Sequence, residues 1–202
     1  GSIKSLTGKN KQLYEDINVA PLLEQIAQHP ELWDAHTRRK TAPQTAHGEM
    51  SDIWVRYNNV APHEESGDYS TFNDRHVPIW YNSWDILTEL KPIVFNIMAA
   101  VRGEMIGAVL ITRIPPGGKI KAHKDDSWHV DYYEKFYVSL ENSPGAVFGC
   151  EHEGVEQKIE PKPGDLYLFD NRKLHWVENN SDSNKTTLII CIRTDMIERR
   201  PQ

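Results

Sequence analysis

The spacing of hydrophobic residues changes near residue 105, from a helical period to the alternation typical of β-strands. Upstream of this point, apolar residues recur at helical spacing in two segments, which predicts a short helix over residues 21–29 and a longer one over residues 83–102. Pro92 is expected to kink the longer helix, because proline removes a helical hydrogen bond. Between the two helices, residues 52–57 alternate like a strand. The first half of the chain is therefore predicted to be mainly helical.

Downstream of residue 105, short segments rich in β-branched and aromatic residues are separated by clusters of Pro, Gly, Asn and Ser. Eight strands are predicted, over residues 107–114, 119–124, 133–141, 146–150, 155–160, 165–169, 173–179 and 185–193. Eight short strands at this spacing are typical of a β-sandwich or a jelly roll, and the upstream helices are expected to pack on one of its faces. We therefore expect a mainly β fold with helical support.

The length of 202 residues fits a single domain. We expect it to span residues 1–202, with a helical support region over residues 1–105, a β-barrel core over 106–193 and a tail over 194–202. Hydrophobic residues make up 39% of the chain and include six Trp, eight Tyr and five Phe, which is enough for a packed core and excludes a disordered protein.

Charge and cysteine content narrow the class of partner. The chain has 23 Lys and Arg against 29 Asp and Glu, a formal net charge of −6, and no Lys/Arg-rich run. Neither a nucleic acid nor an anionic membrane surface is therefore expected as a partner. The apolar stretches are far shorter than the roughly 20 residues of a transmembrane helix. Cys150 and Cys191 form no disulfide or zinc motif, which fits a reducing, cytoplasmic setting.

Three residues form a candidate metal site. His123 and Asp125 lie two positions apart where the second predicted strand meets a loop, so both side chains project to one side. His175 lies in the seventh predicted strand, which neighbours the second strand in a jelly roll. Two imidazoles and one carboxylate on one face, with the opposite positions open, suit non-haem Fe(II). We therefore predict that these three side chains converge at the mouth of the barrel.

Other histidines fit a metal site less well. A second His-x-Asp spacing occurs at His129 and Asp131, but His123 directly follows a strand, whereas His129 lies in an aromatic-rich loop. His152 falls in a predicted hairpin without a second ligand at matching spacing. The remaining histidines lie outside the barrel, where a solvated surface position is expected; they are His29, His36, His47, His63 and His76.

A family resemblance rests on several motifs taken together. These are residues 111–118 (ITRIPPGG), His123-x-Asp125, 134–140 (EKFYVSL), 163–171 (PGDLYLFDN), His175 and 185–190 (KTTLII), with 29–33 (HPELW) and 52–56 (DIWVR) upstream. Over residues 25–193, this pattern resembles the aspartyl/asparaginyl β-hydroxylase family of Fe(II)- and 2-oxoglutarate-dependent oxygenases. The resemblance implies a double-stranded β-helix, a cupin-like jelly roll, preceded by N-terminal helices packed on the barrel. It also implies that His123 and His175 are the iron-binding histidines and that Asp125 is the carboxylate ligand present in many members.

The resemblance also implies a set of 2-oxoglutarate-binding residues. Thr112 stands where the family has a hydroxyl on the first barrel strand, Lys135 and Tyr137 where it has Arg and His, and Lys185 where it has Arg. Lysine keeps the positive charge without the guanidinium fork, and tyrosine donates one hydrogen bond without a charge. Arg193, on the same face of the last strand as Lys185, is the second choice for the oxo-acid anchor. No catalytic residue is expected beyond the metal ligands.

The implied activity is that of a dioxygenase that uses Fe(II), 2-oxoglutarate and O₂ to hydroxylate a C–H bond, with release of succinate and CO₂. Family members act on Asp or Asn side chains of proteins or on free amino acids such as proline, so a small-molecule or peptide substrate is expected. Aromatic residues are expected around the pocket mouth; they are Trp128, Tyr132, Tyr133 and Trp176. Arg56 is a candidate for pairing with a substrate carboxylate, and a structural salt bridge is the alternative.

Two other classes of function stay open at this stage. The Lys and Tyr substitutions in the expected oxo-acid site are compatible with a jelly-roll binding module that has lost turnover. The same three metal ligands also occur in principle in a cupin-type metal enzyme that uses no oxo-acid.

Overall fold

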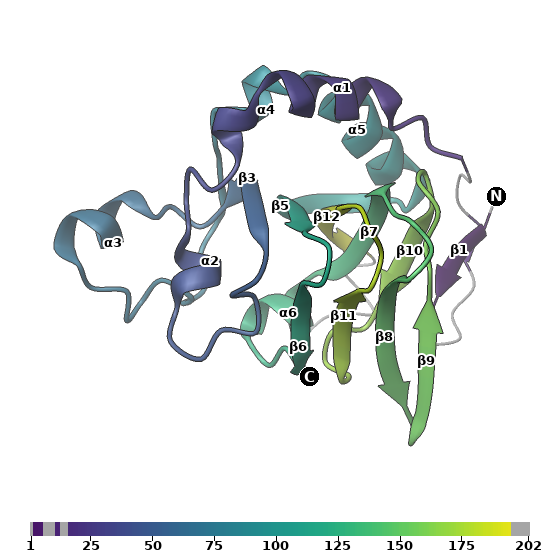
Figure 1. Ribbon diagram of the computed structural model, residues 1–202. Helices are drawn as coiled ribbons and strands as arrows, with labels where there is room; N and C mark the ends of the chain where they lie inside the picture. Colours follow the sequence, from purple (N-terminus) through teal and green to yellow (C-terminus); the bar gives the residue numbers. More distant parts are fainter. Residues whose placement is uncertain (1, 6–10, 13–15, 195–202) are drawn as a thin grey trace.

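A computed structural model describes residues 2–5, 11–12 and 16–194 (Figure 1). All eight strands predicted downstream of residue 105 are present, within a few residues of the predicted bounds. They are β5 (Gly103–Ile114), β6 (Lys119–His123), β7 (Glu134–Glu141), β8 (Ala146–His152), β9 (Val155–Ile159), β10 (Leu166–Phe169), β11 (His175–Asn179) and β12 (Lys185–Thr194). They divide between two sheets, which confirms the mainly β, jelly-roll prediction. The predicted tail beyond residue 194 lies outside the described residues.

The larger sheet has the strand order β2-β1-β10-β7-β12-β5-β3-β4, and the smaller one has the order β6-β11-β8-β9. Strands β6 and β11 are therefore neighbours, as the jelly-roll topology predicted. The first half of the chain contributes strands as well as helices; these are β1 (Ser2–Ser5), β2 (Lys11–Gln12), β3 (Ser51–Tyr57) and β4 (Ile79–Trp80). Only β3 was predicted, because β1, β2 and β4 are two to four residues long and too short to show an alternating pattern.

Helices α1 (Ala20–Gln28), α4 (Ser83–Ile86) and α5 (Leu90–Ala100) lie together along the larger sheet (Figure 1). The shorter helices are η1 (Pro30–Leu32), α2 (Arg38–Thr41), α3 (Ala61–Ser66) and α6 (Trp128–Tyr132). The single kinked helix predicted over residues 83–102 is wrong, because the chain leaves helical geometry at residues 87–89 and re-enters it upstream of Pro92. Pro92 lies in the first turn of α5, where a backbone N–H has no helical acceptor to lose.

No helix in the described part of the chain combines the length and the hydrophobicity that crossing a bilayer requires.

Strand β12 shows how one alternating sequence builds two cores. Leu188 and Ile190 belong to the cluster that packs the larger sheet against α1 and α5. Ile189 and Cys191 belong to a second cluster, which fills the space between the two sheets. Lys185 lies on the same inner face as this second cluster and lines a pocket there. The space between the two sheets is therefore apolar near Ile189 and Cys191 and becomes polar near Lys185, at the start of β12.

Close packing of an indole ring on a glycine joins two strands of the smaller sheet. Gly149 on β8 lies opposite Trp176 on β11, and a Cβ atom at position 149 would overlap the Trp176 ring. We expect Gly149→Ala to lower the free energy of unfolding by about 1–3 kcal/mol, because the indole must leave its position. Urea denaturation measures this change.

Gly48→Ala is the matched control. Its added Cβ would lie 4.0 Å from the carbonyl oxygen of Lys40, a distance of ordinary van der Waals contact. Its free energy of unfolding should therefore change by less than about 0.5 kcal/mol. Equal stabilities of the two variants would contradict the proposed packing of Trp176 on Gly149.

Candidate metal centre

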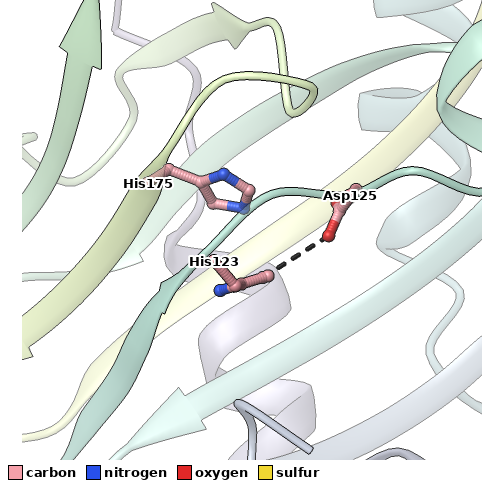
Figure 2. Close-up of side chains that lie close together, drawn as sticks. All are labelled: His123, Asp125 and His175. Carbon is pink, nitrogen blue, oxygen red and sulfur yellow. Dashed lines mark ion pairs between the residues drawn. The ribbon is translucent and has the colours of Figure 1, made fainter.

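The three predicted metal ligands lie together at the junction of β6 and β11 (Figure 2). His123 at the end of β6 pairs in register with His175 at the start of β11, and their ring centroids are 4.3 Å apart. Asp125 lies two residues after β6, and its backbone N–H donates to the Asn171 carbonyl at 2.9 Å. One potential ligand atom from each of the three side chains lies within 4.8 Å of the other two.

Hydrogen bonds to the backbone set the orientation of both imidazoles. Nδ1 of His123 lies 2.7 Å from the Lys121 carbonyl oxygen, and Nδ1 of His175 lies 2.8 Å from that of Lys173. A carbonyl can only accept, so each Nδ1 carries a proton and Nε2 is the ring nitrogen that would bind a metal. Burial lowers the pKa of His175 to about 4, which keeps this ring neutral at pH 7.

Asp125 completes the set as a carboxylate. Burial alone raises the pKa of Asp125, but Lys135 and the two histidines together hold it well below its usual range. Asp125 Oδ1 lies 3.4 Å from Nε2 of His123. Two ligands that each lie about 2.1 Å from one ion at right angles are roughly 3 Å apart, so this spacing is close to that of a shared metal. The donor set therefore fits a divalent transition metal with open positions.

A pocket opens beside the two histidines, between the two sheets. All four residues predicted to bind the oxo-acid line this pocket; they are Thr112, Lys135, Tyr137 and Lys185. They come from β5, β7 and β12, three adjacent strands of the larger sheet. Two of the three expected metal ligands, His123 and His175, and the four oxo-acid residues implied by the resemblance therefore line one pocket.

Two lysines contribute positive charge to the pocket. Lys185 is 2% exposed, and its Nζ donates to the Asn142 side-chain oxygen at 2.9 Å. No acidic side chain among the described residues lies within ion-pair distance of Lys185, and burial lowers its pKa to about 8. Lys135 instead lies near the metal centre, with its Nζ 3.7 Å from Asp125 Oδ2. A buried cation without a counter-ion is costly, so Lys185 favours an anionic ligand in the pocket.

Three residues at the pocket or the metal centre were not predicted from the sequence. Arg39 and His47 line the pocket from the first half of the chain, and His47 had been expected on the solvated surface. The His47 ring lies 5.2 Å from that of His123, and burial lowers the pKa of His47 to about 2. No local pattern indicates these positions, because long-range folding brings them to the barrel. Asn171 is 1% exposed and could have been noticed at the end of the 163–171 motif.

Two arginines considered for ligand binding lie elsewhere. Arg193 does not line the pocket, and its Nη1 donates to the Tyr132 carbonyl at 2.9 Å while its guanidinium lies over the Tyr132 ring. Arg56 is also absent from the pocket lining, and its guanidinium stacks 4.7 Å from the Trp80 ring centroid. The second-choice role of Arg193 and the substrate-pairing role of Arg56 are therefore not supported.

The aromatic residues expected at the mouth do not line the pocket either; they are Trp128, Tyr132, Tyr133 and Trp176. The first three pack with the second core cluster, and Trp176 covers Gly149. In the competing pair, Asp131 is 66% exposed and lies 3.7 Å from Arg172. Among the described residues, the only cluster with metal-ligand spacing is the one formed by His123, Asp125 and His175.

Asn171 holds several parts of the centre together. Its side-chain Nδ2 donates to the Tyr137 hydroxyl at 2.7 Å and lies 3.2 Å from Nε2 of His175, while its carbonyl accepts from Asp125. We expect Asn171→Ala to strengthen Co(II) binding by up to about tenfold, because the variant removes an N–H donor that competes with the metal for the electron pair of His175 Nε2. Visible absorption of bound Co(II) measures this affinity. The exposed Asn180→Ala is the control, and equal affinities of the two variants would contradict this competition.

Solved structures with a similar fold include oxygenases. An oxidoreductase of the 2OG-Fe(II) oxygenase family from Burkholderia pseudomallei aligns with 85% of this chain and 89% of its own, at 18% identity and a TM-score of 0.53. A Pseudomonas putida prolyl-4-hydroxylase aligns over 92% of each chain, at 14% identity and a TM-score of 0.48. At these identities the first likeness indicates a shared fold alone. No curated protein sequence matches the chain.

The sequence itself matches a family over more than half of its length. Residues 80–194 match the family described as aspartyl/asparaginyl beta-hydroxylase. The matched segment runs from the second residue of β4 to the last residue of β12 and includes all three candidate metal ligands. Arg39 and His47 lie upstream of it. The chain therefore belongs to the aspartyl/asparaginyl β-hydroxylase family and is an oxygenase-type hydroxylase.

Proposed function

We propose that the protein is an Fe(II)- and 2-oxoglutarate-dependent dioxygenase that hydroxylates a C–H bond of an amino acid, an amino-acid residue in a protein, or a related small molecule. The observation that carries this proposal is the position of a buried Lys185, without an acidic partner among the described residues, in the same pocket as two histidines of a His-Asp-His cluster. When bound, iron and 2-oxoglutarate supply the oxidising chemistry, in which O₂ gives one oxygen atom to the substrate and one to succinate, with release of CO₂.

His123, Asp125 and His175 are proposed to hold the metal. The two imidazoles have a fixed ring orientation, and the carboxylate offsets half of the charge of a divalent ion. Because all three ligands come from β6, the turn after it and β11, they leave the side facing the pocket open. That open side is where the oxo-acid and O₂ must bind.

Lys185 and Lys135 are proposed to bind the two carboxylates of the oxo-acid. Lys135 lies beside Asp125 and is therefore placed for the carboxylate nearest the metal. Lys185 lies farther along the strand pair, near Thr112, whose partner across the strands is Thr187. The Thr112 hydroxyl adds a hydrogen bond to the distal carboxylate, and the Tyr137 hydroxyl, already an acceptor from Asn171, can donate to the ligand.

An anaerobic titration with Fe(II) tests the proposal. Addition of 2-oxoglutarate should produce a weak metal-to-ligand charge-transfer band in the visible, since the keto oxygen and a carboxylate chelate the iron. Succinate is the matched control, because it lacks the keto group and should give no band. Admission of O₂ should then convert 2-oxoglutarate to succinate and CO₂.

The outcomes separate the alternatives. Binding of 2-oxoglutarate without succinate formation would favour a binding module. Metal-dependent turnover of an organic substrate without 2-oxoglutarate would favour a cupin-type enzyme. If the band does not form with the intact protein, the proposed function is wrong.

A further inference from the structure

Arg39 reaches the pocket from outside the family-matched part of the chain. It lies in α2, its side chain is 11% exposed, and it lines the pocket together with His47 and His123. Its Nη1 donates to both carboxylate oxygens of Asp52, at 2.9 and 3.0 Å. A single nitrogen therefore makes the whole ion pair. Nε and Nη2 make no hydrogen bond with any described residue, so the rest of the guanidinium fork is available to a ligand.

The charged side chains in and around the pocket carry one more positive charge than negative charges. Arg39, Lys135 and Lys185 are the Lys and Arg side chains that line it, and no acidic side chain among the described residues does so. The nearest carboxylates, Asp52 and Asp125, lie within ion-pair distance of Arg39 and Lys135 respectively. One positive charge is thus uncompensated. Fe(II) and 2-oxoglutarate carry opposite charges of equal size, so their binding leaves this excess unchanged.

Arg39 is the cation best suited to that remaining anion. Lys135 and Lys185 already serve the two carboxylates of the oxo-acid in the proposed function. Burial alone lowers the pKa of Arg39, but Asp52 raises it above its usual value, so the side chain stays charged. A guanidinium presents paired N–H groups that match a carboxylate, whereas an ammonium acts as a point charge.

We propose that Arg39 is the specificity-determining residue that binds a free carboxylate of the substrate beside the metal centre. The inference rests on the proposed function and adds a chemical class to it: the substrate is a carboxylic acid, and the corresponding carboxamide is discriminated against. A neutral amide leaves the excess positive charge of the pocket uncompensated and offers one acceptor oxygen in place of two.

Binding without turnover tests this proposal. The probes are the twenty common L-amino acids and their α-carboxamides, presented to the Zn(II)-loaded protein with 2-oxoglutarate and followed by ligand-observed NMR. At least one acid should bind, and its carboxamide should bind about 30-fold more weakly, as expected for loss of a charge-assisted contact. The proposal is overturned if no acid binds, or if acid and carboxamide bind equally.

A paired substitution identifies the residue responsible. Arg39→Gln alone would leave the buried Asp52 carboxylate unpaired and threaten folding. The double variant Arg39→Gln with Asp52→Asn replaces the ion pair by neutral amides. It should lose acid binding about 30-fold while its affinity for 2-oxoglutarate changes less than about threefold. Asp52→Asn alone is the matched control. The charge that it leaves unpaired belongs to Arg39, whose side chain is 11% exposed against 2% for Asp52, and the variant should retain acid binding because Arg39 is still present.

The two proposals fail in different ways. Loss of 2-oxoglutarate affinity, rather than acid affinity, in the double variant would assign Arg39 to the oxo-acid and overturn this inference. If 2-oxoglutarate does not bind the wild-type protein, the proposed function fails instead. The acid and carboxamide comparison on the Zn(II) protein alone then still decides the role of Arg39.

Discussion

Replacing His175 by alanine is expected to abolish the charge-transfer band and the formation of succinate. His175 provides one of three candidate metal ligands, and its ring is fixed by the Lys173 carbonyl and by contact with Phe169. Loss of an outer-shell partner typically weakens a metal site 10–100-fold, so loss of a ligand should weaken Fe(II) binding by more than about 100-fold. The titration described above measures both the affinity and the band.

The control for this variant is another histidine of the same sheet. His152 ends β8 and lies 3.7 Å from Glu153, so His152→Ala should bind iron like the wild type. Because His175 is buried, replacing it by alanine leaves a cavity. Asp125→Asn tests the same centre without creating a cavity, because the Asp125 side chain is 29% exposed and asparagine has nearly the same size. A band that survives both His175→Ala and Asp125→Asn would show that the metal lies elsewhere.

Replacing Lys185 by methionine is expected to change binding and stability in opposite directions. The affinity for 2-oxoglutarate should fall about 30- to 100-fold, because a charge-assisted contact to a carboxylate is lost. The ligand-free protein should become more stable, because methionine removes a buried cation that has no counter-ion. Burial lowers the Lys185 pKa from 10.5 to about 8, and such a shift corresponds to about 3 kcal/mol of penalty on the charged form. Isothermal titration and urea denaturation measure the two effects.

The same lysine sets a pH dependence. Below pH 8 it is protonated in both folded and unfolded protein, so the full penalty of burying the charge applies. Between about pH 8 and 10.5 the unfolded chain binds more protons than the folded one, so the Lys185 contribution makes stability rise with pH. The stability difference between wild type and Lys185→Met should therefore shrink over this window. Binding of 2-oxoglutarate should weaken above about pH 8, as the free protein loses the ammonium.

Lys185→Arg is the control, because it keeps the positive charge and changes the shape of the side chain. It should keep most of the affinity for 2-oxoglutarate. If Lys185→Met binds the oxo-acid as tightly as the wild type, Lys185 is not the anchor. If it is also less stable than the wild type, the lysine contributes to the fold and not to ligand binding.

The strands and the cluster of candidate metal ligands could be predicted from the sequence because both depend on local rules. Alternating hydrophobicity and turn residues fixed the eight barrel strands. The His-x-Asp spacing and the pairing of β6 with β11 then brought His123 and His175 into register. The two-residue period of a strand indicates which side chains share a face, but it does not give their position along the barrel.

Arg193 shows the limit of that period. It shares the face of Lys185 by counting, but it lies eight residues farther along the strand, about 26 Å at the usual rise per residue. The pairing of β12 with β5 also shifts register between Ile190 and Ile192. Arg193 therefore ends beside Tyr132, away from the pocket. Arg39 and His47 were missed for the opposite reason, since only the folded chain brings residues so distant in sequence to the barrel.

The pairing of β3 with β5 places Asp52 directly across from Thr112. The residue that positions Arg39 is thus held at a fixed register to a residue of the oxo-acid pocket, although the two lie in separate stretches of the chain. If Arg39 binds the substrate as proposed, the barrel holds the candidate metal ligands and the connection between α1 and β3 sets the choice of substrate. Redesign of the residues around Arg39 in this connection, with His47 kept because its ring lies 5.2 Å from that of His123, is then a route to new substrates.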